Sequence, residues 1–174
     1  MKTLYVLRHA KSSWEDPSLE DKLRPLSRRG IKSVPHIANA LVASRKIPEL
    51  VISSPAERAL QTTALLKSAL AGYYETFVQK VDDRIYDTTP ESLLEVLHDT
   101  PDSFETALIV GHNPELERFV ELLCFGTDTG HLLLPTAALA ILTMESAQWS
   151  AIQPASAILE ALLPIKLLKR LAKD

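Results

Sequence analysis

The chain has 174 residues, of which 46% are apolar and 24% are charged, and its formal net charge is −3. This length can bury a sizeable hydrophobic core, and the composition is ordinary for a globular protein. The weak negative charge argues against a nucleic-acid or membrane surface, so an anion site would need a local concentration of positive charge. We therefore expect a single domain over residues 1–174, with neither nucleic acid nor a membrane as a partner.

Cysteine content and the N-terminal residues indicate the compartment. Cys124 is the one cysteine, so an internal disulfide cannot form. The N-terminus runs straight into the first predicted strand, which leaves no room for a signal peptide. No apolar run in the sequence reaches the roughly 18 residues of a membrane span. We therefore expect a cytoplasmic protein.

Apolar runs of strand length alternate with segments of helical spacing along the chain. We expect strands at 4–7, 50–55, 77–81, 106–114, 139–144 and 158–163, helices at 27–45, 56–66, 90–97 and 114–123, an extended segment from Trp149, and a basic amphipathic tail at 165–173. Strands that alternate with helices form βαβ units. The sequence therefore predicts an α/β fold, a three-layer α/β/α sandwich around a mostly parallel sheet of about six strands.

The first predicted strand ends abruptly in Arg8 and His9. In open parallel sheets, ligands bind just beyond the carboxyl ends of the strands, which is where these two residues lie. A cation and an imidazole at that point suggest an anionic ligand and a nucleophile or general base. Taken alone, however, the pair is an ordinary start of a loop.

Two later strand ends repeat this arrangement. Arg58 lies shortly after the second predicted strand, and His112 follows Gly111 at the end of the fourth. Two guanidinium groups and two imidazoles at one sheet edge suit a phosphoryl group, because arginine presents a fixed fork of donors. Helix N-termini near Pro55 and Pro114 would add backbone donors, and Gly111 permits a close backbone approach.

The two imidazoles suggest covalent catalysis. A histidine can attack phosphorus and form a phosphoenzyme if it is neutral, and nearby arginine charges lower its pKa. The other histidine can stay protonated and donate to the phosphoryl oxygens in the transition state. These residues do not by themselves decide which histidine has which role.

Three motifs resemble those of a known superfamily. Residues 7–10 (Leu-Arg-His-Ala) resemble the Arg-His-Gly signature of the histidine phosphatase (phosphoglycerate mutase-like) superfamily, residues 53–62 its second arginine motif, and residues 110–114 its second histidine motif. Residues 7–14, 24–30 and 135–140 resemble the short bacterial SixA-like branch, the phosphohistidine phosphatases. The resemblance extends over nearly the whole chain.

The resemblance implies a phosphoglycerate mutase-like fold and a role for each motif residue. His9 would be the phosphorylated nucleophile, and Arg8, Arg58 and His112 would hold the phosphoryl group. Ser12, in the loop after His9, is a further candidate for substrate binding. The resemblance implies no metal and no organic cofactor. The expected partner is a phosphorylated substrate, and a signalling protein that contains phosphohistidine is one candidate.

The sequence departs from the superfamily pattern at three places. Ala10 replaces a frequent glycine, and Glu15 stands where many relatives have a phosphate-binding asparagine. The nearest candidates for the general acid of the relatives are Asp82 and Asp83, although a solvated turn at the end of a strand is the favoured interpretation of both. An alkoxide leaves poorly without a proton, whereas the nitrogen of a phosphoramidate can leave already protonated. A missing acid would therefore favour phosphohistidine over sugar phosphates.

Other functions remain open alternatives at this point. A broad small-molecule phosphomonoesterase and a non-catalytic phosphate-binding module would use the same residues. A metal site on His9 and His112 is disfavoured because Arg8 and Arg58 would repel the cation. A cysteine phosphatase is disfavoured because an arginine would be needed six residues after Cys124.

One further pair in the first loop has two interpretations. Asp21 and Arg24 either shape the entrance of the site or form an exposed ion pair of little energetic value.

Overall fold

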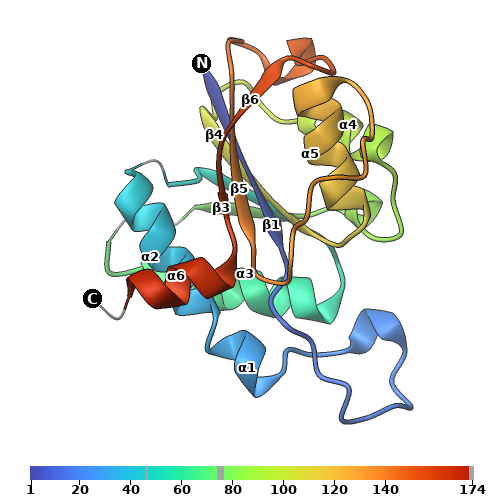
Figure 1. Cartoon of the computed structure of the whole chain (residues 1–174), viewed down its shortest axis with the longest axis vertical. Helices are drawn as coiled ribbons and strands as arrows, with labels where there is room; N and C mark the ends of the chain where they lie inside the picture. The colour runs from blue at the N-terminus through green and yellow to red at the C-terminus, as the bar shows by residue number, and fades with distance from the viewer. Residues whose placement is uncertain (46, 74–76, 173–174) are drawn as a thin grey trace.

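The computed structural model describes residues 1–45, 47–73 and 77–172, which contain one six-stranded sheet (Figure 1). The strands are β1 (Lys2–Arg8), β2 (Leu50–Ser53), β3 (Val78–Val81), β4 (Thr106–Gly111), β5 (Leu139–Met144) and β6 (Ala157–Leu163). Their spatial order is β3-β2-β4-β1-β5-β6. Only β5 runs antiparallel to its neighbours, so the predicted mostly parallel sheet is confirmed.

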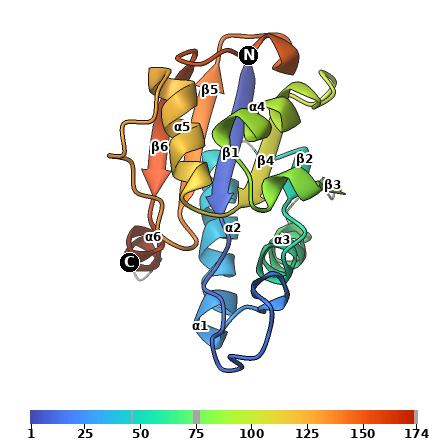
Figure 2. The same ribbon diagram turned by 90° about the vertical axis from the view of Figure 1, so that its right-hand side faces the viewer.

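Helices cover both faces of this sheet (Figure 2). One face packs against α4 (Pro90–His98) and α5 (Glu115–Phe125). The other packs against α2 (Val34–Ser44), α3 (Glu57–Leu70) and α6 (Ile165–Leu171). The central strands β1, β2, β4 and β5 read as nearly unbroken Leu, Ile, Val and Ala because both of their faces are buried. The predicted three-layer sandwich is confirmed.

Two predicted elements differ in the structure. The helix expected from Ser27 is split into α1 (Arg28–Ile31), which Ser27 caps, and α2, whose first turn contains Pro35. The extended segment predicted from Trp149 is instead a 3₁₀ turn, Trp149–Ala151. Its indole is fully buried and donates from Nε1 to the carbonyl of Phe104 at 2.8 Å, so tertiary packing decides the local conformation there.

The predicted basic amphipathic tail forms a helix, α6, over Ile165–Leu171, with basic residues in its last turn; position 173 lies outside the described residues. Within the described part of the chain, no helix is both long enough and apolar enough to cross a membrane.

Strand register determines which residues meet at the functional edge. Arg8 lies opposite Gly111 in the β1–β4 pair, and Ser53 lies opposite Val110 in the β2–β4 pair. Three strands therefore end at the same level, and the segment between β1 and α2 extends beyond that edge (Figure 2). This places the residues that follow β1, β2 and β4 around one region.

A close backbone contact anchors the first of these segments. A Cβ added to Gly30 would lie 2.2 Å from the carbonyl oxygen of Lys11. The same oxygen accepts from the backbone N–H of Ser27 at 2.8 Å and from its hydroxyl at 3.0 Å. Gly30 is therefore required for α1 to lie directly on the chain that follows His9.

We expect Gly30→Ala to lower the free energy of unfolding by about 1–3 kcal/mol, because the added methyl group forces the two backbones apart. Thermal unfolding measures the change. Gly72→Ala is the matched control, because a Cβ there meets nothing within 4 Å. Equal Tm values for the two variants would show that this contact is unimportant.

Candidate active site

Backbone hydrogen bonds fix His9 at the end of β1. Its N–H donates to the carbonyl of Gly111 on β4 at 3.1 Å. The next N–H, that of Ala10, donates to Oγ1 of Thr62 on α3 at 3.1 Å. The residue is therefore held by both the neighbouring strand and a helix, and only 7% of its surface is exposed. Such constraint favours a precise orientation of the ring.

The tautomer of His9 follows from one hydrogen bond. Nδ1 lies 2.7 Å from the carbonyl oxygen of Ala10, and because a carbonyl can only accept, the ring proton must be on Nδ1. Nε2 then carries the lone pair, and Nε of Arg58 donates to it at 3.3 Å. The arrangement leaves the ring with the nitrogen that a nucleophile needs.

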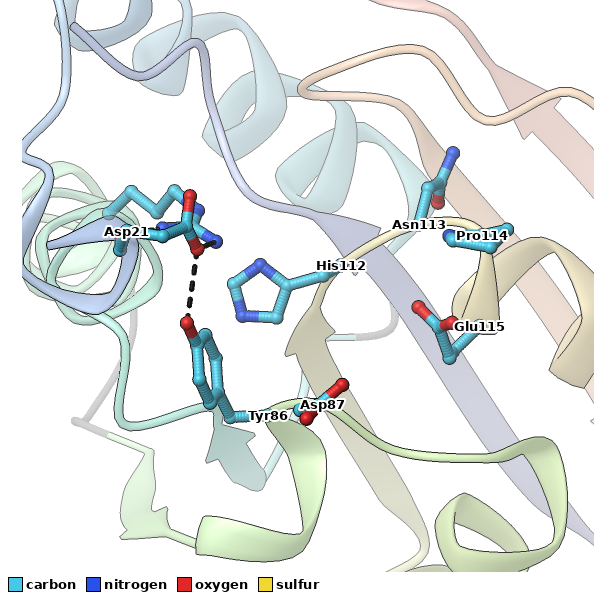
Figure 3. Close-up of a pocket in the computed structure, with 8 residues that line it drawn as sticks. Asp21, Tyr86, Asp87, His112, Asn113, Pro114 and Glu115 are labelled. Carbon is cyan, nitrogen blue, oxygen red and sulfur yellow. Dashed lines mark hydrogen bonds and ion pairs between the residues drawn. The ribbon is translucent and has the colours of Figure 1, made fainter. Parts of the chain in front are cut away.

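The ring of His112 lies next to that of His9. The two ring centroids are 5.0 Å apart, and Nε2 of His112 is 2.7 Å from Oγ of Ser54. Figure 3 shows this ring beside the hydrogen bond in which the Tyr86 hydroxyl donates to Asp21 at 3.1 Å. Nδ1 of His112 is buried and, among the described residues, has no hydrogen-bond partner.

Two arginines approach the imidazoles from different elements. Arg58, in the first turn of α3, donates from Nη2 to the Asp21 carboxylate at 2.8 Å. Arg8, at the end of β1, donates from Nη1 to the carbonyl of Leu134 at 2.9 Å. Nε of Arg8, like Nδ1 of His112, is buried without a partner in the described chain. Buried polar atoms of this kind are normally hydrogen-bonded, so the two nitrogens point to a bound ligand.

All five residues singled out in the sequence line one cavity of about 250 Å³: Arg8, His9, Ser12, Arg58 and His112. A second cavity of about 450 Å³ shares Asp21, Arg58, His112 and Asn113 with the first, and it extends toward Tyr86 and the start of α5 (Figure 3). The predicted convergence of three strand ends is therefore present in the structure. The smaller cavity is the candidate site for a phosphoryl group.

Burial makes both imidazoles neutral in the free protein. The pKa of His9 is lowered to about 4, mainly by burial and further by the charges of Arg58 and Arg8. The pKa of His112 is lowered to about 3, again mainly by burial. The second histidine, which the sequence interpretation expects to be protonated in the transition state, is thus neutral in the unliganded site. A bound phosphoryl dianion would raise this pKa, because an opposite charge favours the imidazolium.

Neither predicted general-acid candidate lines the site. Asp82 is buried and accepts from Nε and Nη2 of Arg84 at 3.0 and 2.8 Å. These hydrogen bonds lower its pKa to about 2, so it is ionised and engaged elsewhere. Asp83 is exposed on the 3₁₀ turn Asp83–Ile85, outside both cavities. Asp82 is thus a buried cap of that turn and not a solvated residue.

Two other details of the sequence interpretation are revised. Glu15 is exposed and lines neither cavity, so it does not replace the expected asparagine contact. Gly111 makes room for a protein side chain and not only for a ligand, because an added Cβ would lie 2.9 Å from Cγ2 of Ile85.

Arg24 shapes the wall of the smaller cavity. It is only 5% exposed, its guanidinium carbon lies 3.0 Å from the ring centroid of Trp14, and it donates to Oγ of Ser12 at 3.3 Å. A second donation, to the Ser13 carbonyl at 2.9 Å, fixes the loop. Of the two interpretations of Arg24 and Asp21, the entrance role fits, because the arginine is buried among these groups.

Sequence reasoning missed several lining residues, among them Asn113, Tyr86 and Thr136. Asn113 had a signal, since it directly follows His112 in the third motif, and its Nδ2 donates to the Leu134 carbonyl at 2.8 Å. Tyr86 follows a turn far from any motif, and nothing in its local sequence predicts its contact with Asp21.

The Leu134 carbonyl that holds Arg8 and Asn113 is itself positioned by two glutamates of α5. Oε1 of Glu117 accepts the N–H of Leu134 at 2.7 Å. The buried carboxylate of Glu121 accepts from the backbone N–H groups of residues 129–132 and from the Thr129 hydroxyl, at 2.6–2.8 Å. Through this loop, α5 determines where the Arg8 guanidinium lies.

In the described residues, no group of three or more His, Cys, Asp or Glu side chains is arranged to hold a metal ion. Cys124 is half-buried at the end of α5, where burial raises its thiol pKa to about 11. It is therefore a packing residue and not a reactive thiolate.

Comparison with known proteins agrees with this geometry. The profile of the histidine phosphatase superfamily (branch 1) matches residues 4–87. An uncharacterized chloroplastic protein of Arabidopsis thaliana is 32% identical over 127 residues, 69% of this chain and 58% of that protein. An uncharacterized protein of Mycobacterium tuberculosis is 31% identical over 161 residues, 88% of this chain and 96% of that protein.

A solved structure adds the fold. The crystal structure of a provisional phosphohistidine phosphatase SixA from Agrobacterium tumefaciens is 28% identical, with a TM-score of 0.76 and coverage of 93% of this chain and 97% of that chain. The fold and site therefore define a phosphatase that acts as a hydrolase. The chain belongs to the histidine phosphatase superfamily, and within it to the SixA-like branch.

We expect His9 and His112 to stay neutral between pH 7 and pH 5 in the free protein, since their pKa values are about 4 and 3. Nitrogen chemical shifts of the two rings, followed by NMR, measure this. Between about pH 4 and pH 6.5 the unfolded chain binds more protons, so the free energy of unfolding falls as the pH falls. Protonation of either ring near pH 6.5 would contradict the burial argument.

We expect Glu121→Gln to lower the free energy of unfolding by at least about 2 kcal/mol. The NH₂ group of the glutamine cannot accept hydrogen bonds, so some of the backbone N–H groups of residues 129–132 lose their acceptor. Chemical denaturation measures this, and Glu95→Gln, an exposed change on α4, is the control. An equal effect of the two changes would show that the loop is not held by Glu121.

Proposed function

We propose that the protein hydrolyses phosphorylated substrates through a phosphohistidine intermediate on His9, with proteins phosphorylated on histidine as the substrate class. The observation that carries the proposal is the neutral His9 ring, which presents Nε2 to a cavity lined by Arg8, Arg58 and His112. A binding site for phosphate alone does not need an oriented nucleophile. The arginines can bind the phosphoryl oxygens, and the lone pair on Nε2 of His9 can attack the phosphorus atom.

The reaction proceeds in two displacements. The lone pair of His9 Nε2 forms a bond to phosphorus, and the bond from phosphorus to the leaving atom breaks with its electron pair going to that atom. Water then attacks the phosphorus, the bond to Nε2 breaks, and its electron pair returns to the ring while a proton from water passes to solvent. Arg8, Arg58 and the imidazolium that His112 becomes beside the dianion stabilise the charge on the phosphoryl oxygens in both steps.

The preference for phosphohistidine follows from the surroundings of the leaving group. Asp82 and Asp83 lie outside both cavities. Burial raises the pKa of Asp21, but the hydrogen bonds from Arg58 and Tyr86 and the charges of Arg58 and Arg24 together outweigh burial, so the pKa is lowered. Neither the two predicted candidates nor Asp21 is thus suited to give a proton to an alkoxide. The imidazole of phosphohistidine can leave already protonated on its other nitrogen, so it needs no such acid.

The remaining expectations belong to the same proposal. We propose that residues 1–174 act as a single domain, without a cofactor, on a phosphorylated partner and not on nucleic acid or a membrane. The absence of paired cysteines supports a cytoplasmic location. The Arabidopsis relative is named as chloroplastic, so the compartment is to be tested by localisation of the tagged protein.

The substrate class is tested by comparing the turnover of a phosphohistidine peptide with that of a sugar phosphate, and the intermediate by trapping. Brief exposure to ³²P-labelled phosphohistidine peptide, then denaturation at alkaline pH, should leave an acid-sensitive label on the wild type and none on His9→Ala. Faster turnover of the sugar phosphate would favour a small-molecule phosphomonoesterase. Neither label nor turnover would favour a phosphate-binding module.

We expect Arg58→Ala to lower kcat by about 100- to 1,000-fold, because it removes a charged donor from the transition state. Steady-state kinetics with the phosphohistidine peptide measure this, with circular dichroism as the check of folding. Arg45→Ala, which changes an arginine at the C-terminal cap of α2, is the control. Wild-type kcat in Arg58→Ala would remove this residue from the site.

A further inference from the structure

The two connected cavities carry opposite charges. The smaller one, around His9, is lined by Arg8, Lys11, Arg24 and Arg58. The larger one, which we call the outer cavity, has Asp87 and Glu115 in its wall, and the ion pair of Asp21 and Arg58 lines both cavities. The anionic phosphoryl end of a substrate therefore fits the smaller cavity, and a cationic group fits the outer cavity.

The carboxylates of the outer cavity are not equally available. Asp21 is paired with Arg58 at 2.8 Å, so its charge is largely neutralised. Asp87 and Glu115 make no ion pair or side-chain hydrogen bond within the described residues, and Figure 3 shows both on the side of the cavity beyond the His112 ring. Lys22, whose ammonium group lies 5.5 Å from the Tyr86 ring centroid, does not line this cavity.

The outer cavity adjoins the smaller one and offers a place for the leaving group. His9 Nε2 attacks from the floor of the smaller cavity, so in-line displacement directs the leaving group away from that floor. The outer cavity shares His112, Arg58 and Asn113 with the smaller one, and its volume of about 450 Å³ can take a side chain or a small organic group. A group that leaves through it passes Asp87 and Glu115.

We propose that Asp87 and Glu115 select substrates by the charge of the leaving group, favouring phosphorylated compounds whose leaving group is cationic and rejecting those whose leaving group carries a carboxylate. This inference rests on the proposed function and narrows its substrate class. Basic side chains next to a phosphorylated residue, or an ammonium group on a small phosphate ester, have the required charge. Acidic phosphate esters are repelled before they reach His9.

The two positions permit conservative tests. Asp87 has a φ of +52°, a left-handed conformation that asparagine tolerates well, so Asp87→Asn removes the charge without new strain. Glu115 is the first residue of α5, and Glu115→Gln keeps the length of the side chain. The control variant, Glu145→Gln/Glu160→Gln, removes two exposed carboxylates that lie outside both cavities.

The experiment compares kcat/KM for phenyl phosphates that carry an aminomethyl or a carboxymethyl group in the para position. We expect the wild type and the control variant to prefer the cationic compound. In Asp87→Asn/Glu115→Gln the ratio of the two kcat/KM values should fall by about five- to tenfold, since each partly exposed charge contributes modestly. In the wild type, added salt should also lower the ratio of the two kcat/KM values, because it screens the carboxylates, whereas its effect on binding of the phosphoryl group is common to both compounds.

An unchanged ratio in the double variant would overturn the proposal, even if all rates fall together. A wild-type ratio that does not respond to salt would also overturn it. These failures are separate from failure of the proposed function, because a phosphorylated His9 and hydrolysis of both compounds would still be observed. If neither compound is hydrolysed and His9 is not labelled, the proposed function itself is wrong, and the selection proposal falls with it.

Discussion

The parallel pairing of β1 with β4 is the constraint on which the site depends. Because Arg8 lies opposite Gly111, the residues that follow the two strands, His9 and His112, are neighbours, and their ring centroids are 5.0 Å apart. A shift of one residue in this register would turn the side chains of one strand to the other face of the sheet. The buried Leu, Val and Ile side chains on both faces make such a shift costly, so the hydrophobic core itself holds the two imidazoles together.

Burial supplies the chemistry as well as the geometry. Desolvation is the largest cause of the low pKa of each histidine, and the arginine charges add to it. Burial therefore keeps the His9 ring neutral, and the hydrogen bond from Nδ1 to the Ala10 carbonyl keeps the lone pair on Nε2. Positive charge comes from Arg8 and Arg58, which cannot lose a proton at neutral pH. The two roles thus fall to different side chains: a neutral imidazole can act as the nucleophile, and the permanently charged guanidinium groups can bind the anion.

The sequence predicted the sheet edge because the signals there are local. Apolar runs that end in Arg8-His9 or in Gly111-His112 indicate both the strand and the place where a ligand binds. The neutral form of His112 and the engagement of Asp82 with Arg84 could not be predicted in this way, since they depend on burial and on contacts made only in the folded chain. The same holds for Glu117 and Glu121, which read as ordinary helix residues but fix the loop that carries Leu134.

The site combines a rigid floor with a wall that carries charges of its own. The floor is built from strand ends and the first turn of α3, whereas the outer wall comes from the turn at Tyr86 and Asp87 and from the start of α5. Arg8, His9 and Arg58 of the floor lie within residues 4–87, which match the profile of the superfamily to which the chain belongs. The wall lies in segments that the three motifs, apart from the residues directly after His112, do not include. Differences in substrate among proteins with this floor are therefore expected to arise in such wall segments.

The convergence of four side chains on one phosphoryl group is tested most directly by a crystal structure with vanadate. The account predicts a vanadium atom bonded to Nε2 of His9, with its equatorial oxygens within hydrogen-bond distance of Arg8, Arg58 and His112. Vanadate bound elsewhere, or bonded to any atom other than Nε2 of His9, would contradict the account.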